Sequence, residues 1–207
     1  VTIQSGAILA VVSLYRRQLA SRSGLLLKLG AAFLPTGLLG YLFYKTVKSF
    51  FHPSIVSYML IAGGAALIVI ERYLKNRPAA AGCLQSVSYK KAFTIGLIQS
   101  ISMIPGVSRA GATIMGGLLV GLNRKDATEF SFLLAVPTML AATAYDIYKN
   151  FGVFSFGDWE NILAGFLTSF LFAVIAVKAL LKFITSHTFI PFGIYRIAAG
   201  ILFLLVL

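Results

Sequence analysis

One nine-residue segment carries the residue types best suited to chemistry, Pro105-Gly106-Val107-Ser108-Arg109-Ala110-Gly111-Ala112-Thr113. Arg109 is a permanent cation in an otherwise apolar stretch, where inserting it into a membrane costs about 3 kcal/mol. Gly111 begins the next apolar run, whose first helical turn offers free backbone N–H groups. Ser108 and Thr113 add hydroxyls on either side. These groups together favour a phosphate or diphosphate ligand. The alternative is a helix break in which Arg109 snorkels or pairs with a buried carboxylate.

Two charged residues outside this segment are secondary candidates. Asp126-Ala127-Thr128-Glu129 fits a capping box, with Asp126 as N-cap and a glutamate three residues on. In the alternative, Glu129 faces the segment as a partner for Arg109 or for a metal-bound phosphate. Arg196 lies inside the last apolar run, where an isolated charge is either functional or paired with another helix.

The sequence shows no metal site. The chain has one cysteine, Cys83, and its two histidines, His52 and His187, lie far apart and fit loop positions. The metal ligands are therefore unknown from the residues alone.

The composition predicts an all-α integral membrane protein. Of the 207 residues 58% are apolar and only 12% charged, too few charged residues for a soluble domain of this size. Lys and Arg outnumber Asp and Glu by 18 to 6, for a net charge of +12. These cations occupy short loops between apolar runs, which indicates contact with membrane lipids and excludes a nucleic-acid binder.

Apolar runs of about 20 residues predict the spanning helices. Those that qualify or nearly do are Leu25–Tyr44, Ser54–Ile70, Ala127–Ile147, Asn161–Leu181 and Thr188–Leu207. Val1–Tyr15 is apolar from the first residue and is typical of the back half of a span, so we expect that the chain lacks an N-terminal segment. We expect residues 1–207 to form a single membrane domain.

A helix-loop-helix is predicted at about residues 90–122. Ala92–Ile104 and Gly111–Leu122 are too short to cross, and Pro105 and Gly106 separate them. The segment is either a re-entrant hairpin or one broken helix that crosses. The hairpin places 13 basic residues inside and 3 outside, whereas a crossing gives 10 and 6, so the positive-inside rule favours the hairpin.

A weak internal repeat is one further interpretation of the sequence. Phe33–Leu38 matches Phe189–Ile194 in pattern, and each segment is expected to open an apolar span. Membrane proteins built from repeats often place their site where two broken elements meet.

The Pro105–Thr113 segment resembles the P-G-x-S-R-S-G-x-T motif of the undecaprenyl-diphosphate phosphatase family, also called the bacitracin-resistance family. The flanking stretches Ile3–Val12, Glu129–Pro137 and Ile190–Arg196 resemble that family too. The likeness therefore runs the whole length of the chain.

The resemblance implies a multi-pass enzyme of the bacterial plasma membrane with a site open to the outer face. Its members hydrolyse undecaprenyl diphosphate to undecaprenyl phosphate, which recycles the lipid carrier of cell-wall synthesis, and they use Mg²⁺ or Ca²⁺. Arg109 would clamp the diphosphate of this polyprenyl lipid, and Ser108 and Thr113 would hydrogen-bond its oxygens. Gly106 and Gly111 would line the substrate site.

Two departures from the family pattern stand out. Ala110 replaces the second serine of the motif. The glutamate-rich first motif, with its serine and histidine, has no counterpart in the chain, which we attribute to an incomplete N-terminus. A transporter or flippase for an anionic polyprenyl lipid is the rival function, since a broken helix with a central arginine serves transport as well. A structural scaffold would leave Arg109 unexplained.

Overall fold

The computed structural model describes residues 2–21, 23–75, 83–149 and 159–207, and in these ranges every regular element is a helix. This confirms the predicted all-α polytopic fold. The helices are α1 (Thr2–Ser21), α2 (Ser23–Leu42), α3 (Tyr44–Ser49), α4 (Pro53–Lys75), η1 (Leu84–Ser86), α5 (Tyr89–Ser100), η2 (Ile101–Met103), α6 (Arg109–Leu119), α7 (Arg124–Lys149), α8 (Trp159–Ile184) and α9 (Ile190–Val206).

The predicted spans correspond to α2, α4, α7, α8 and α9, with ends that differ by a few residues. The first four are long and apolar enough to cross a membrane, and α9 is shorter. The helix predicted within Val1–Tyr15 continues to Ser21, and the run predicted to end at Tyr44 breaks at Phe43 before the short α3. Val1, Arg22 and Arg77, which entered the predictions, fall outside the described residues.

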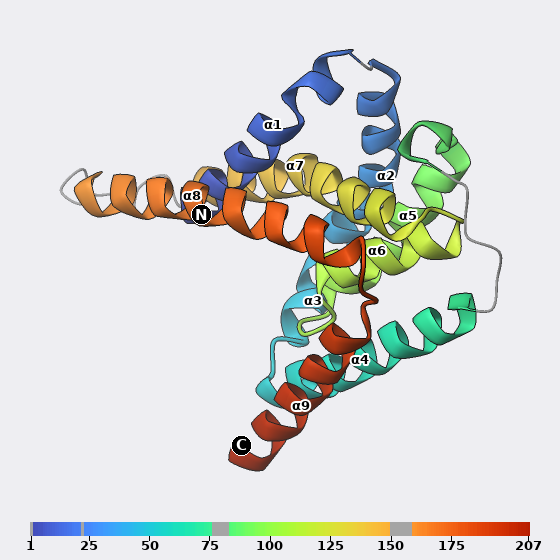
Figure 1. Cartoon of the computed structure of the whole chain (residues 1–207). Coiled ribbons are helices and arrows are strands. Elements are labelled where there is room, and N and C mark those ends of the chain that lie inside the picture. Colours follow the sequence, from blue (N-terminus) through green and yellow to red (C-terminus); the bar gives the residue numbers. More distant parts are fainter. Residues whose placement is uncertain (1, 22, 76–82, 150–158) are drawn as a thin grey trace.

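The helices form two groups (Figure 1). In the larger group α1 packs between α8 and α7, and α7 packs in turn on α6 and α2. The second group is the pair α4 and α9, which contact each other extensively and reach the larger group mainly through α6. The core of buried apolar side chains lies in the larger group, around Phe130, Leu133 and Leu134 of α7.

The segment predicted as a helix-loop-helix is an antiparallel hairpin of α5 and α6. Gly116 of α6 faces Ile95 and Ile98 of α5, and Lys91 at the start of α5 lies near Gly121 just after α6. Helices of 12 and 11 residues are about 18 and 16 Å long, too short for a hydrocarbon core of about 30 Å. The chain therefore returns to the end from which it came, as the positive-inside rule predicted, and the alternative of a crossing is wrong.

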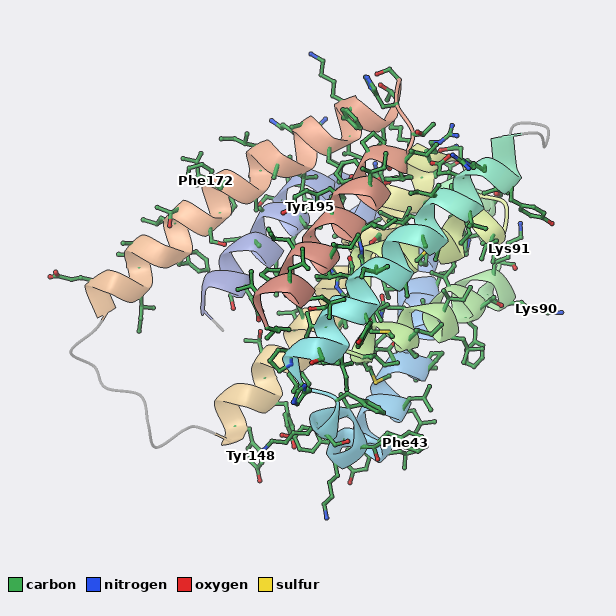
Figure 2. All side chains as sticks on the ribbon, turned by 90° about the horizontal axis from the view of Figure 1, so that it is seen from below. Phe43, Lys90, Lys91, Tyr148, Phe172 and Tyr195 are labelled. Atoms are coloured by element: carbon green, nitrogen blue, oxygen red, sulfur yellow. The ribbon has the colours of Figure 1, made fainter. Side chains whose placement is uncertain are left out.

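Contacts between the other helices show which of their ends lie beside the start of α5. The Lys28 ammonium near the start of α2 donates a hydrogen bond to the Gln85 carbonyl just before α5. The C-terminal end of α4 meets the starts of α7 and α9 at Glu71. Figure 2 shows Lys90 and Lys91 projecting at this end and Phe43 and Tyr148 at the other. We call them the basic end and the aromatic end.

The two proline segments proposed as an internal repeat occupy different places. Pro35 lies inside α2, so Phe33–Leu38 does not open a helix as expected, whereas Pro191 is in the first turn of α9. Gly193 packs directly on Gly64 of α4, while the nearest neighbour of a Cβ at Gly37 would be the ring of Phe33 in its own helix. The short likeness between the segments does not extend to their packing, and the internal repeat stays a prediction.

Candidate functional site

The tip of the hairpin, residues 104–108, has a constrained backbone. Gly106 has a φ of +93° and Ser108 a φ of +71°, and Ser108 alone among the described non-glycine residues has a positive φ. Ser108 is the N-cap of α6, and its hydroxyl oxygen accepts a hydrogen bond from the Gly111 amide at 3.2 Å. Such conformations persist only where the surrounding structure enforces them, and they cluster at functional sites.

The start of α6 offers unused donors. No hydrogen bond among the described residues uses the amides of Ser108, Arg109 or Ala110. The Ser108 side chain is exposed, so its hydroxyl proton is also available. Free amides at the positive end of a helix dipole suit an anion, and the anion site expected from the sequence stays a prediction.

Arg109 is the first residue of α6 and is partly buried. Among the described residues its guanidinium makes one hydrogen bond, a long one of 3.4 Å from Nη1 to the Ser131 carbonyl of α7. Within the described part of the chain no carboxylate lies within 4.0 Å of it, so its charge is not neutralised by an ion pair. The alternative of a buried carboxylate partner, Glu129 included, is therefore wrong for these residues.

The Arg109 side chain borders an apolar cavity of about 290 Å³ between α1, α7 and α8. Arg109 is the sole charged residue among the described residues that line it. The other lining residues are Ala7, Ile8, Val11, Phe132, Ala135, Val136, Met139, Ala173, Ala176, Val177 and Leu180. A cation beside an apolar cavity matches a ligand with an anionic head and a hydrocarbon tail.

Thr113 lies in the core behind the first turn of α6 and does not line the site. It is completely buried, and its hydroxyl lies 2.8 Å from the Arg109 carbonyl and 3.0 Å from Gln99 Oε1. The Gln99 amide nitrogen donates to Thr36 of α2 at 3.0 Å and to Thr138 of α7 at 3.5 Å. This placement corrects the predicted role of Thr113 as a ligand of the phosphate oxygens, because its hydroxyl faces the core.

Arg196 also lies close to the tip, on the side of the tip that faces α4. It is buried on α9, and its Nη2 donates to the carbonyls of Gly106 at 2.7 Å and Val107 at 2.8 Å. Arg196 thus binds the backbone of the tip and has no carboxylate partner among the described residues, and its functional role stays a prediction. The structure thus gathers Gly106, Ser108, Arg109, Gly111 and Arg196 in one place.

The predicted capping box at Asp126–Glu129 is wrong. The N-cap of α7 is Asn123, whose side-chain oxygen accepts a hydrogen bond from the Asp126 amide at 2.8 Å. Asp126 is thus the third residue of the helix, because α7 begins at Arg124. Glu129 is buried, lies 4.0 Å from Lys125, and faces the basic end of the bundle rather than the hairpin tip.

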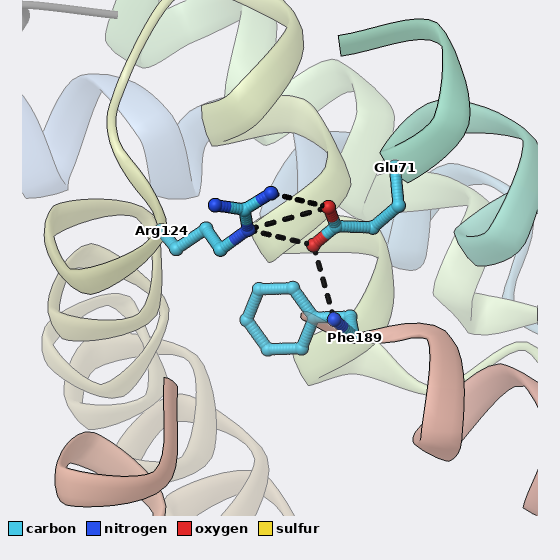
Figure 3. Close-up of polar contacts among 3 residues, drawn as sticks. All are labelled: Glu71, Arg124 and Phe189. Carbon is cyan, nitrogen blue, oxygen red and sulfur yellow. Dashed lines mark hydrogen bonds and ion pairs between the residues drawn. The ribbon is translucent and has the colours of Figure 1, made fainter. Parts of the chain in front are cut away.

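One buried carboxylate, Glu71, was not recognised from the sequence. It accepts three hydrogen bonds from the Arg124 guanidinium, the shortest 2.8 Å long, and one from the Phe189 amide at 3.0 Å (Figure 3). This group joins α4, α7 and α9 at the basic end. Its signal was a single carboxylate at the end of the apolar run 54–70, which its basic neighbours obscured.

The described residues do not form a metal site. They contain no group of three or more His, Cys, Asp or Glu side chains that could hold an ion, and Glu71 is already bound to Arg124 and Phe189. The divalent cation expected from the resemblance therefore has no ligand set in the described part of the structure.

The fold is that of a multi-pass helical membrane protein, and the tip of its hairpin brings together free backbone amides and an arginine without a carboxylate partner among the described residues. Comparison with known proteins gives the family. The family model "Bacitracin resistance protein BacA" matches residues 1–202, and the chain belongs to this family.

Curated relatives carry the name undecaprenyl-diphosphatase. The chain is 55% identical over 205 residues to the proteins of that name from Sulfurihydrogenibium sp. and Persephonella marina, covering 99% of this chain and 81% of each relative. It is 52% identical over 204 residues to that of Wolinella succinogenes, covering 99% of this chain and 80% of the relative.

Proposed function

We propose that this protein hydrolyses undecaprenyl diphosphate to undecaprenyl phosphate and inorganic phosphate at the hairpin tip. Water attacks the terminal phosphorus, a new P–O bond forms, and the bridging P–O bond breaks to release the lipid monophosphate. The observation that carries the proposal is the Arg109 guanidinium, which has no carboxylate partner among the described residues and lies between the free amides of α6 and an apolar cavity. The name shared by the relatives supports it.

The residues at the tip have separate tasks in this reaction. Arg109 binds the diphosphate oxygens and neutralises the charge that develops on them, which is the main requirement of phosphoryl transfer. The amides of Ser108, Arg109 and Ala110 bind further oxygens, and the Ser108 hydroxyl donates one more hydrogen bond. Gly111 leaves the first turn of α6 without a side chain beside Ser108, so a phosphate can approach the backbone.

The proposed location is the bacterial plasma membrane with the site open to the outer face. Gly106 packs on Val56 near the start of α4, and Met103 lies next to Gly40 near the end of α2. Both helix ends belong to the aromatic end, which the positive-inside rule assigns to the outside. An enzyme of this kind returns the lipid carrier to cell-wall synthesis and confers resistance to bacitracin.

We also propose a requirement for a divalent cation, Mg²⁺ or Ca²⁺, from the resemblance to the family. Magnesium commonly binds through one or two carboxylates together with substrate phosphates, so a complete cage of protein ligands is not needed. We expect EDTA to abolish phosphate release and added Mg²⁺ or Ca²⁺ to restore it. Full activity in EDTA would contradict the requirement.

Phosphate release from undecaprenyl diphosphate in detergent tests the function. The full-length gene product should release phosphate, and Arg109→Ala should lower the rate about 10²- to 10³-fold, because one charge-assisted contact is lost. Arg109→Lys should fall between the two, since lysine keeps the charge but not the planar fork. Tyr195→Phe, at an exposed position of α9, is the matched control and should match the wild type.

Two outcomes would contradict the proposal. Near-normal release by Arg109→Ala would remove Arg109 from the reaction. A wild-type protein that moves the lipid across vesicle membranes with its diphosphate intact would favour the rival function of a transporter or flippase.

A further inference from the structure

Arg196 of α9 is buried without an opposite charge. Its Nη2 donates to three backbone carbonyls, those of Gly106 at 2.7 Å, Val107 at 2.8 Å and Met59 at 3.4 Å. Within the described residues no carboxylate lies within 4.0 Å, and its buried Nε has no hydrogen-bond partner. Burying a guanidinium is costly unless it is paired or hydrogen-bonded. Here all of its hydrogen bonds go to main-chain oxygens.

The surrounding backbones leave room for this guanidinium. A Cβ at Gly63 of α4 would overlap Arg196 Nη2, and a Cβ at Gly64 would lie 2.6 Å from the Gly193 carbonyl of α9. On the other side, Nη1 lies 3.4 Å from the position of a Cβ at Gly111, in the first turn of α6. The guanidinium thus sits between α4, the hairpin tip and the start of α6.

Holding a carbonyl fixes the amide on the other side of the same peptide bond. In a planar trans peptide the C=O and the following N–H point in opposite directions. With the Val107 carbonyl turned toward Arg196, the Ser108 amide points to the far side of the tip. Ser108 needs such a restraint, since its φ of +71° costs a non-glycine residue about 1–2 kcal/mol.

We propose that Arg196 is a positioning residue for the anion site. It fixes the carbonyls of Gly106 and Val107 and so presents the Ser108 amide and the start of α6 to the diphosphate, without touching the substrate. This role rests on the proposed function. It also explains why α9 bears an arginine inside an apolar helix that otherwise packs on α4.

Steady-state kinetics of phosphate release from undecaprenyl diphosphate tests this role. Arg196→Gln should lower kcat about 10²-fold, the cost of a small misplacement of groups at the reacting centre, with KM changed by less than about threefold. Arg196→Lys should recover part of kcat, because an ammonium also carries several donors on one nitrogen. The matched control is Arg124→Gln at the other end of the α4 and α9 pair, which should lower the unfolding temperature and keep kcat within about twofold.

Hydrogen exchange of the backbone amides gives a readout that needs no turnover. In Arg196→Gln, peptides covering residues 104–112 should exchange at least about tenfold faster, because the restraint on the tip is lost, while peptides around Glu71 stay protected. Arg124→Gln should show the reverse pattern. If the wild type releases no phosphate, the proposed function fails, and this exchange pattern still decides whether Arg196 holds the tip.

The proposal is overturned by any of three results. Arg196→Gln could keep the wild-type kcat, or Arg124→Gln could lose kcat to the same extent. Exchange at residues 104–112 could also be unchanged in Arg196→Gln.

Discussion

The pair α4 and α9 is tied to the rest of the protein by an arginine at each end, and the two arginines differ in their partners. At the basic end, Arg124 binds the Glu71 carboxylate, which also accepts the Phe189 amide. At the hairpin tip, Arg196 binds only carbonyl oxygens. The first group is neutral as a whole, and the second keeps its full positive charge.

The difference shows how a structural arginine can be distinguished from one that serves an anion site. Glu71 is buried and its charge is balanced by that of Arg124, so this group carries no surplus charge for an anionic ligand. Arg109 and Arg196 both approach the start of α6, and neither has a carboxylate within 4.0 Å among the described residues. The uncompensated charge therefore accumulates where the amides are free, and an anionic ligand would complete the site.

The largest difference in phosphate release between a change at the hairpin tip and a change at the basic end is expected at Gly106. Gly106→Ala places a methyl group against the Val56 carbonyl and forces alanine to a φ of +93°. The tip then moves relative to α4, and phosphate release should fall more than about 10²-fold. Gly121→Ala is the matched control, since it has a φ of +92° but open space around it, and it should only lower stability by about 1 kcal/mol. Equal rates for the two variants would show that the shape of the tip is irrelevant.

The next effect should fall on stability alone. Glu71→Gln removes the negative charge that accepts hydrogen bonds from both Arg124 and the Phe189 amide. We expect the free energy of unfolding to drop by about 2 kcal/mol. Thermal unfolding in detergent measures the loss, and kcat of the folded protein should be unchanged. A loss of kcat with normal stability would give Glu71 a catalytic role.

Two serine N-caps provide a smaller contrast. Ser88 caps α5 by accepting the Lys91 amide at 3.2 Å, as Ser108 caps α6. Ser88→Ala and Ser108→Ala should each cost about 1 kcal/mol of stability. Only Ser108→Ala should also slow phosphate release, about tenfold, because its hydroxyl hydrogen-bonds a charged oxygen. If Ser88→Ala slows release equally, the effect comes from helix stability.

The smallest effect is expected at Ala110, where the family motif has a second serine. Ala110→Ser restores that hydroxyl in the first turn of α6, and its effect on stability should stay below about 0.5 kcal/mol. Phosphate release should change by less than about threefold, because the amide of residue 110 is present in both forms. A gain of tenfold or more would show that the missing hydroxyl limits this protein.

The spans and the hairpin were predictable because they follow from the lengths of apolar runs and from Pro105 and Gly106. The local part of the site was predictable too, since Ser108, Arg109 and Gly111 are neighbours in sequence. The partners of Arg196 were not, because carbonyl oxygens occur at every residue and carry no signal in the sequence. Thr113 was placed on the substrate side because nothing in the sequence indicates which face of α6 packs on Gln99.

Gly96 determines how the hairpin is held. Its α-carbon approaches the Ala32 carbonyl of α2 so closely that a methyl group would overlap it, and Thr36 of α2 donates a hydrogen bond to the Gly96 carbonyl at 3.2 Å. In a bilayer, apolar area contributes little to helix association, so fit between small residues takes over. A single added carbon at position 96 would push α5 away from α2, and the displacement would reach the free amides at the start of α6 without altering any residue of the tip.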